Sequence, residues 1–476
     1  MTVRLFVRRF ASRQGAVGVA LALWMPAAPL GAAPQAAAPK TPIPYVDAGP
    51  VIEAVRGSLP TELTGKTPAD LESSWSGWVS RRDTAIRTRL ERGDEDSIVF
   101  LWHYGTSFTK LPPVTERNLA RLGGASATEA IVQKRMEDLL SGIALPGADE
   151  RLRFARQVVE RKDINPLTTA GKVQMRLYLL ELRQRVLAEY EENKRTLESA
   201  TLLDPVAALA AYLTMFRDRG LSSDTSILPA FAIDQALESI KAEGTLGAGG
   251  VRRVAIIGPG LDFANKDDGY DFYPQQTIQP FALMDSLVRV GLAKPQDLLV
   301  TTFDLSPRIN QHIEATRERA RAGVGYTLHL PLQGEEEWNP DLLAYWRRLG
   351  GSIGTDVEPL PAPASAGKIQ VRAVRIPPAR VLSIAPRDLN IVVERLEPLA
   401  ADEQFDLIVA TNVLVYYDVF EQELALVNLG KMLRPGGVFL SNTPVPPMAP
   451  MTLSDRYTTV SYNPRQRDYV FRYQRQ

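Results

Sequence analysis

The chain has 476 residues, which is too long for one hydrophobic core and predicts two domains with additional segments. Lysine plus arginine and aspartate plus glutamate are equal at 55 each, so no net charge attracts nucleic acid or an anionic membrane surface. Cysteine is absent, which excludes disulfides, zinc–thiolate sites, iron–sulfur clusters and thiol catalysis. We therefore expect a globular protein that does not bind nucleic acid.

The first 38 residues have the pattern of an export signal. An apolar run over 15–25 follows four basic residues, Arg4, Arg8, Arg9 and Arg13. Basic, apolar and small-residue regions in this order are typical of a secretory signal. The apolar run is shorter than the roughly 20 residues that span a bilayer, and no later segment reaches that length. We expect a periplasmic or secreted protein with no integral membrane segment in the mature chain. The alternatives are a misplaced start codon, which implies a cytoplasmic protein, or a tethered N-terminus.

Residues 40–245 are predicted to form a helical domain. Thr67, Pro68 and Asp70 mark a helix start, because they supply a capping residue, a proline at the first helical position and an acid in the first turn. The clearest helix covers 171–199, where a core-facing stripe recurs at spacings of three and four: Met175, Leu179, Leu182, Val186 and Tyr190.

His103 is the only histidine in this helical half. It has no partner histidine at ligand spacing, so we interpret it as a packed or surface residue and expect no metal site. The loop 105–108 that follows is interpreted as a plain turn. The alternative is that it faces the crevice of the second domain.

A glycine-rich stretch at 243–250 is the predicted domain boundary, and an α/β domain is expected after it. The first apolar strand leads into Gly258 and Gly260, which let the backbone turn sharply and approach a ligand closely. A dinucleotide site would need a third glycine in place of Phe263 and a ribose-binding acid about 20 residues further on. The next acid at a strand end is Asp304, 304 − 258 = 46 positions later, which disfavours NAD.

Two further strand ends carry candidate binding groups. The apolar strand 298–303 ends at Asp304, whose carboxylate can accept hydrogen bonds from both hydroxyls of a ribose or cap the following helix. The strand at 381–384 is followed by Asp388 and Leu389. There an acid can accept from an exocyclic amine while a leucine covers the ring face, although Asp388 is equally suited to cap a helix.

The αβ rhythm is interrupted between 324 and 378. Alternating segments at 326–330 and 369–376 predict a small antiparallel β-subdomain. Two more alternating segments, 457–462 and 468–473, predict a closing hairpin of the main sheet.

The most informative stretch covers 405–440. Its apolar run 407–410 is typical of a buried parallel strand, and Thr411 and Asn412 close it with polar groups that would face the ligand crevice. An amphipathic helix pattern follows and ends at a Pro-Gly-Gly turn before the next apolar strand.

This order of strand, helix, Pro-Gly-Gly turn and strand resembles the second half of the class I S-adenosylmethionine (SAM)-dependent methyltransferases. The sequence at 412–418 is similar to that of the CheR-type protein-glutamate methyltransferases, which also place a helical domain before the catalytic one. The resemblance covers about residues 251–476. It implies an α/β, Rossmann-like sheet of seven strands with an antiparallel C-terminal hairpin, preceded by an all-α domain.

The resemblance also implies the cofactor SAM and a set of site residues. The cofactor-binding residues would be Gly258, Gly260, Gln279, Asp304, Asp388, Leu389 and Asn412. Tyr416 matches the active-site tyrosine of the CheR-type enzymes and would orient the methyl acceptor. The acceptor would be a carboxylate on a protein, or a small molecule, and no metal is required. The inserted β-subdomain would engage protein partners, or serve another purpose.

Three positions depart from the family pattern. Ile256 stands where the family has an acid, and Pro259 removes a backbone donor from the glycine loop. Gln279 replaces the acid that begins the following helix in CheR-type enzymes, unless its role is taken by Asp262, Asp267 or Asp268. Two other interpretations therefore stay open: an exported, degenerate methyltransferase fold that acts as a binding protein, and a related aminopropyl-transferring fold.

Overall fold

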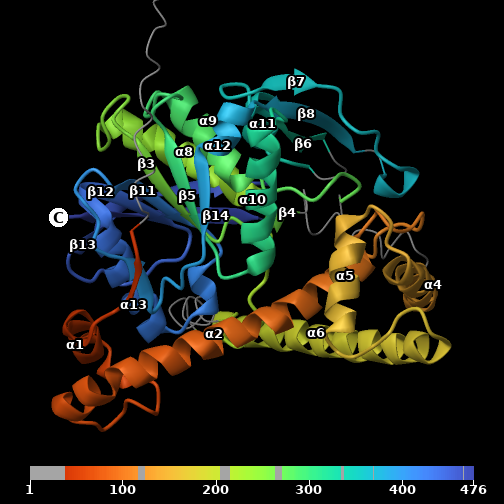
Figure 1. The fold of residues 1–476 in the computed structure, drawn as a ribbon, viewed down its shortest axis with the longest axis horizontal. Helices are drawn as coiled ribbons and strands as arrows, with labels where there is room; N and C mark the ends of the chain where they lie inside the picture. The colour runs from red at the N-terminus through yellow and green to blue at the C-terminus, as the bar shows by residue number, and fades with distance from the viewer. Residues whose placement is uncertain are drawn as a thin grey trace, which may run out of the picture. The chain divides into compact units, whose positions relative to one another are not determined.

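A seven-stranded mixed sheet forms the centre of residues 39–476 (Figure 1). Its strand order is β13–β14–β12–β11–β3–β5–β9, and the pairs from β12 to β9 are parallel. β14 runs antiparallel to β12, and β13 runs antiparallel to β14. The strands are β3 (Arg253–Ile257), β5 (Leu299–Phe303), β9 (Ile384–Arg387), β11 (Phe405–Ala410), β12 (Leu433–Ser441), β13 (Met451–Ser461) and β14 (Arg467–Arg475). The predicted Rossmann-like sheet with its antiparallel C-terminal hairpin is confirmed.

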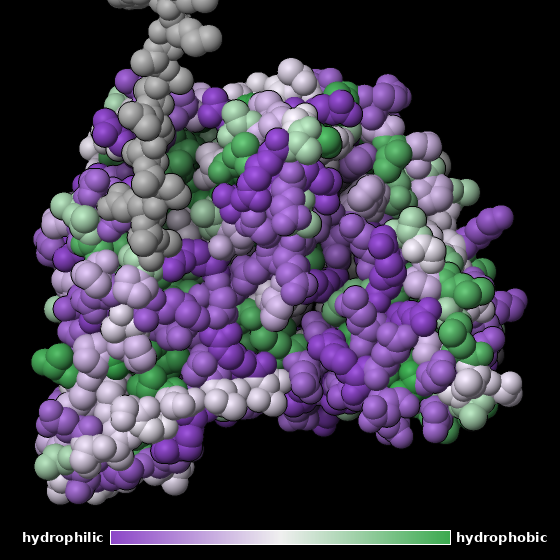
Figure 2. Space-filling view, viewed as in Figure 1, coloured by the Kyte–Doolittle hydropathy of each residue, from purple (hydrophilic) through white to green (hydrophobic). Residues whose placement is uncertain are grey.

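The structure is a computed structural model that describes residues 38–115, 124–203, 215–262, 271–333, 337–367, 369–464 and 466–476. Residues 1–37 of the predicted export segment lie outside these ranges. Within them, no helix is both long and apolar enough to cross a membrane. The face drawn in Figure 2 is largely hydrophilic, and its hydrophobic residues lie in small separate groups.

β11 shows why the central strand could be recognised from its sequence. All six residues of Phe405–Ala410 are buried, because β3 and β12 flank the strand and both faces of the sheet are covered. Asp406 is the polar exception. Its carboxylate accepts hydrogen bonds from the backbone N–H groups of Arg252 and Arg253 at 2.8 and 3.0 Å, and it pairs with Arg434 at 2.5 Å. Asp406 therefore ties together the entrances of β3, β11 and β12.

The helices packed around the sheet include one that the sequence assigned to the helical domain. α8 (Leu228–Glu243) packs against α9 and the β13–β14 hairpin, and its apolar residues belong to the core of the sheet. Residues 39–476, which include the predicted boundary at 243–250, form one compact unit. The remaining helices here are α9 (Gln279–Val290), α10 (Pro307–Arg321), α12 (Pro378–Leu382), the 3-10 turn η3 (Leu414–Tyr416) and α13 (Val419–Met432).

The N-terminal helices have a hydrophobic core of their own, built from residues between Ile98 and Val186. The long helix α2 begins as predicted, with a capping box between Thr67 and Asp70 and Pro68 at the first helical position. The predicted stripe is buried only as far as Val186, because Tyr190 is 51% exposed. The helices are α1 (Tyr45–Ala54), the 3-10 turn η1 (Arg56–Ser58), α2 (Pro68–Tyr104), α4 (Ala125–Ala144), α5 (Glu150–Glu160) and α6 (Thr169–Leu203).

Three small sheets complete the fold. An antiparallel sheet in the order β6–β8–β7 lies within the stretch predicted to hold a β-subdomain, together with α11 and the 3-10 turn η2. Two short pairs, β1–β10 and β2–β4, join the helical region to the α/β region. The elements are β6 (Tyr326–Gln333), α11 (Pro340–Arg348), β7 (Thr355–Val357), η2 (Ala364–Ala366), β8 (Gln370–Ile376), β1 (Lys40–Pro42), β10 (Glu394–Leu396), β2 (Asp224–Thr225) and β4 (Leu261–Asp262).

Candidate functional site

The order of the strands reverses at β3, with β5 and β9 on one side of it and β11 and β12 on the other. In an open α/β sheet, this reversal places a ligand crevice at the carboxyl ends of the strands. Gly258 and Gly260 follow β3, Asp304 follows β5, and Thr411 and Asn412 follow β11. The parallel register therefore brings five of the residues singled out in the sequence to one edge of the sheet. We call this edge the switch-point crevice.

The glycine loop after β3 needs both glycines for reasons that the structure makes explicit. Gly258 and Gly260 each have φ of +64°, a conformation that residues with a side chain rarely adopt. A Cβ on Gly258 would lie 2.7 Å from Cγ2 of Val413, and one on Gly260 would lie 2.6 Å from Cβ of Thr225. Each glycine thus permits a close approach of chain to chain, and Thr225 comes from β2.

Asp304 stands at the carboxyl end of β5, as predicted for a ribose-binding acid. Its Oδ1 accepts a hydrogen bond from the backbone N–H of Ser306 at 2.8 Å, and Ser306 is the residue at the N-cap position of α10. The alternative of an N-cap aspartate is therefore wrong. Burial raises the pKa of Asp304 to about 7 and outweighs the backbone hydrogen bond from Ser306, which lowers it, while the charge of Asp388 adds a smaller increase. A carboxyl group that titrates near neutral pH is typical of a functional site.

Gln279 begins α9 and turns its side chain to the end of β11. Its Nε2 donates to Oγ1 of Thr411 at 2.7 Å. Its Oε1 is buried and has no hydrogen-bond partner among the described residues. This amide oxygen is an acceptor at the crevice, although the carboxylate of the family pattern is missing. Of the possible replacements, Asp267 and Asp268 lie outside the described residues.

Asn412 adopts a left-handed conformation with φ of +58°, which asparagine tolerates better than most residues. Its backbone N–H donates to Oδ1 of Asn442 at 2.8 Å, and Nδ2 of Asn442 donates back to Oδ1 of Asn412 at 2.7 Å. Asn442 directly follows β12, so this pair joins two strand ends. Sequence reasoning missed Asn442, although its place after an apolar strand was a usable signal.

Asp388 has ionic partners that the sequence pattern did not indicate, and Leu389 is buried. The Asp388 carboxylate accepts hydrogen bonds from Arg87 of α2 at 2.6 Å and from Lys40 of β1 at 2.7 Å. Burial alone would raise the pKa of Asp388, but these two cations outweigh it and lower the pKa. Leu389 is 2% exposed and belongs to the core. Both partners of Asp388 are far away in the sequence, which is why the pattern could not reveal them.

Tyr416 lies in the η3 turn above the end of β11. Its ring centroid is 5.8 Å from that of Phe216, which comes from the segment between α6 and β2. Burial raises the pKa of Tyr416, so its hydroxyl stays protonated at neutral pH and can donate a hydrogen bond. The N-terminal region thus contacts the crevice at three places, through Arg87, Phe216 and Thr225.

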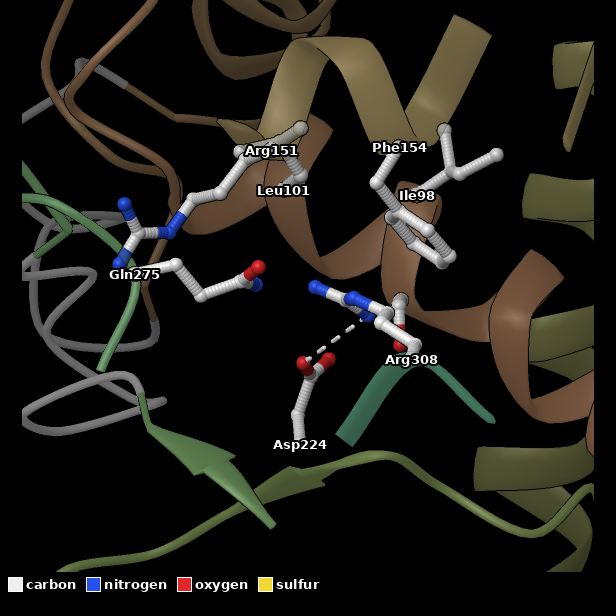
Figure 3. Close-up of a pocket in the computed structure, with 8 residues that line it drawn as sticks. Ile98, Leu101, Arg151, Phe154, Asp224, Gln275 and Arg308 are labelled. Carbon is white, nitrogen blue, oxygen red and sulfur yellow. Dashed lines mark ion pairs between the residues drawn. The ribbon is translucent and has the colours of Figure 1, made fainter. Parts of the chain in front are cut away.

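A second candidate site lies where α2, α5, β2 and α10 meet, and no motif predicted it (Figure 3). We call it the interface cavity. It is a small space that is partly open to solvent. Its lining residues are Ser97, Ile98, Leu101, Arg151, Phe154, Asp224, Gln275 and Arg308.

The loop 105–108 binds the segment beside this cavity and is more than a plain turn. Oδ1 of Asp271 accepts hydrogen bonds from the Thr106 hydroxyl at 2.7 Å and from the Ser107 backbone N–H at 3.0 Å. Nη1 of Arg151 donates to the carbonyl of Tyr273 at 2.7 Å. The loop therefore contacts the α/β region through Asp271, in the segment that precedes α9.

Comparisons with known proteins give structural similarities only. No protein-family model and no curated protein matches the chain. The N-methyltransferase NodS of Bradyrhizobium japonicum WM9 is 14% identical, with 51% of this chain and 96% of that chain covered and a TM-score of 0.25. The magnesium protoporphyrin IX methyltransferase ChlM of Synechocystis PCC 6803 is 11% identical, with 52% of this chain and 81% of that chain covered and a TM-score of 0.23. TrmN of Thermus thermophilus is 14% identical, with 52% of this chain and 52% of that chain covered and a TM-score of 0.24.

Values this low assign no function, and the fold assignment depends on the sheet itself. The strand order, the antiparallel hairpin and the glycine loop after the first strand define a chain with the class I methyltransferase fold.

Proposed function

We propose that this chain is a SAM-dependent methyltransferase that binds SAM at the switch-point crevice. The observation that carries the proposal is the meeting of Gly258, Gly260, Asp304, Gln279 and Asn412 at one edge of the sheet. Asp304 would accept from the ribose hydroxyls, and the unpartnered Oε1 of Gln279 would accept from the amino group of the cofactor. Asp388 and Leu389 do not enter this proposal, because one is bound to two cations and the other is in the core.

When bound, SAM supplies an electrophilic methyl group. The task of the chain is then to hold the acceptor in line with the methyl and to exclude water. A carboxylate acceptor, as in the CheR-type enzymes, is already ionised and needs no general base. The protonated hydroxyl of Tyr416 would donate a hydrogen bond that orients such a carboxylate. The acceptor in this proposal is a carboxylate on a protein.

The test is calorimetric binding of SAM and S-adenosylhomocysteine to the full chain, followed by methyl transfer to glutamate-containing peptides. Tyr416→Phe should lower kcat about tenfold with SAM affinity unchanged, since the lost hydrogen bond acts on the acceptor. Tyr457→Phe is a matched control, because Tyr457 is 59% exposed on β13. A loss of SAM affinity with unchanged turnover in Tyr416→Phe would contradict its assignment.

A non-catalytic binding protein is the second candidate, and one set of contacts favours it. Thr225 packs against Gly260, and Arg87 and Lys40 bind Asp388, so the N-terminal region lies against the edge where SAM would enter. In a methyltransferase, these contacts would restrict the entry of SAM. If the full chain binds neither SAM nor S-adenosylhomocysteine, this second function stands and the first is rejected.

The proposal includes export of the mature chain, with the first 38 residues as the signal. SAM is made inside cells, so export and methyl transfer together require SAM to reach the exported protein. Fractionation of the native host locates the mature protein. A cytoplasmic location would overturn export and leave the methyltransferase proposal intact.

A further inference from the structure

The interface cavity is built around Arg308, in the first turn of α10. Its guanidinium lies over the ring of Phe154, with Cζ 3.6 Å from the ring centroid. This stacking occupies one face of the guanidinium and leaves the N–H groups, which lie in the plane of the guanidinium, free to donate. Nε and Nη1 are buried and have no hydrogen-bond partner among the described residues. Burial of a donor without a partner is unfavourable, so the arrangement favours a bound acceptor.

Asp224 does not satisfy these donors. Its Oδ1 lies 3.9 Å from Nη1 of Arg308, which allows attraction between charges but is too long for a hydrogen bond. The other acids near Arg308 have partners elsewhere. Asp94 binds Arg161 at 2.7 Å, and Oε2 of Glu150 accepts from the backbone N–H of Gln275 at 3.1 Å.

The other side chains that line the cavity include further polar groups and an apolar side. Figure 3 shows the amide of Gln275 and the guanidinium of Arg308 pointing toward one another across the space. Ile98, Leu101 and Phe154 supply the apolar side. Arg151, which is buried, adds a second positive charge to the lining, and its Nε is 4.0 Å from Oδ2 of Asp271.

Charge decides which anion fits. The lining holds Arg151, Arg308 and Asp224, a formal sum of 2 − 1 = +1. A single negative charge matches this sum, whereas a doubly charged phosphate exceeds it and meets stronger repulsion from Asp224. We propose that the interface cavity binds the carboxylate group of a small ligand, held by Arg308 and Gln275.

This inference does not depend on methyl transfer. Asp224 and Thr225 are consecutive residues of β2, so their side chains point to opposite sides of the strand. Asp224 lines the cavity, while Thr225 contacts Gly260 at the switch-point crevice. The two sites are neighbours with separate walls, and each can be tested without a ligand in the other.

The experiment is a thermal-unfolding titration of the full chain with acetate at constant ionic strength, in the absence of SAM. Acetate should raise the Tm in a saturable manner with a half-point in the millimolar range. Arg308→Gln should weaken this response at least tenfold, because it removes both unpartnered donors. Arg308→Lys should give an intermediate response, since it keeps the charge and loses the planar pair of donors.

Arg321→Gln is the matched control on the same helix. Arg321 pairs with Glu314 at 2.9 Å on the exposed side of α10, so its loss should leave the acetate response unchanged. If Arg308→Gln does not fold, Gln275→Leu tests the same group and should weaken the response several-fold. An acetate response that is equal in wild type and these cavity variants overturns the site. Phosphate binding more tightly than acetate overturns the assignment to a carboxylate.

Discussion

The switch-point crevice and the interface cavity lie on opposite sides of β2, but only the residues of the crevice could be predicted from patterns in the sequence. Its residues follow apolar strands, so a local pattern of strand then polar group was enough to find them. The cavity is formed by side chains from four elements, and its two arginines are 308 − 151 = 157 positions apart. Sites at strand ends can therefore be predicted from local patterns, whereas sites between packed helices depend on tertiary contacts.

The largest expected effect concerns the contact that separates the two sites. Gly260→Ala should lower the free energy of unfolding by about 2–4 kcal/mol, because it adds strain at positive φ to a clash with Thr225. Gly323→Ala is the control, since Gly323 has φ of +85° and nothing within 4 Å of the added Cβ. It should cost only about 1 kcal/mol. Denaturant unfolding measures both.

The double variant Gly260→Ala with Thr225→Gly sharpens this comparison. Removal of the Thr225 Cβ should restore the part of the loss that comes from the clash. If the two single variants at Gly260 and Gly323 lose equal stability, the close contact between β2 and the glycine loop does not exist in solution.

The second prediction concerns the crevice alone. Asp304→Ala should weaken SAM binding by one to two orders of magnitude, following from roughly 1.5–3 kcal/mol for a lost charged hydrogen bond. Asp297→Ala is the matched control, because Asp297 is an exposed acid just before the same strand, at its opposite end. Calorimetry that shows equal affinities for the two variants would remove Asp304 from the site. The acetate response of the interface cavity should be the same in both.

The third prediction follows from the pKa of Asp304, which burial raises to about 7. The ionised carboxylate is the form that accepts two hydroxyl hydrogen bonds, so affinity should rise as pH increases through 7. Between pH 6 and pH 8 the ionised fraction of a group with this pKa grows about tenfold, and SAM affinity should follow. Asp304→Asn should lose this component of the pH dependence. An unchanged pH profile in that variant would assign the dependence to another group.

The smallest expected effect tests whether the N-terminal region restricts the crevice. Arg87→Gln should lower the free energy of unfolding by at most about 1 kcal/mol, because its ion pair with Asp388 is partly exposed. It should also raise the association rate of SAM a few-fold, since one contact across the edge is lost. Arg56→Gln, which removes an exposed pair with Glu53, is the control and should change neither quantity measurably. A slower association rate in Arg87→Gln would contradict the restriction.

The fold was predictable to a large extent because its signals are local. The apolar run of β11, the capping box at Thr67 and Asp70, and the alternating strands of the C-terminal hairpin are each contained in a few residues. The position of α8 was not predictable, since an amphipathic helix does not show which core it packs against. Tyr190 keeps the period of its helix but is 51% exposed, because the period alone does not show where the buried stripe ends.

The candidate site was predictable only in part. Gly258, Gly260, Asp304 and Asn412 were found because the parallel register alone brings strand ends together. The residues that contact this edge of the sheet, such as Arg87 at Asp388 and Thr225 at Gly260, come from the other half of the chain. No pattern of spacing could have identified them.

The pairing of β1 with β10 has a consequence for the order of events during synthesis. Pro42 pairs with Glu394, so 394 − 42 = 352 further residues must be made before this pair can close. At roughly 5–20 residues per second, the N-terminal strand stays without its partner for roughly 20–70 s. During that interval the leading segment and the residues after it are held by no contact with β10, and Lys40 cannot yet reach Asp388. An export machinery that recognises the nascent N-terminus would therefore meet a chain in which the β1–β10 pair has not yet formed.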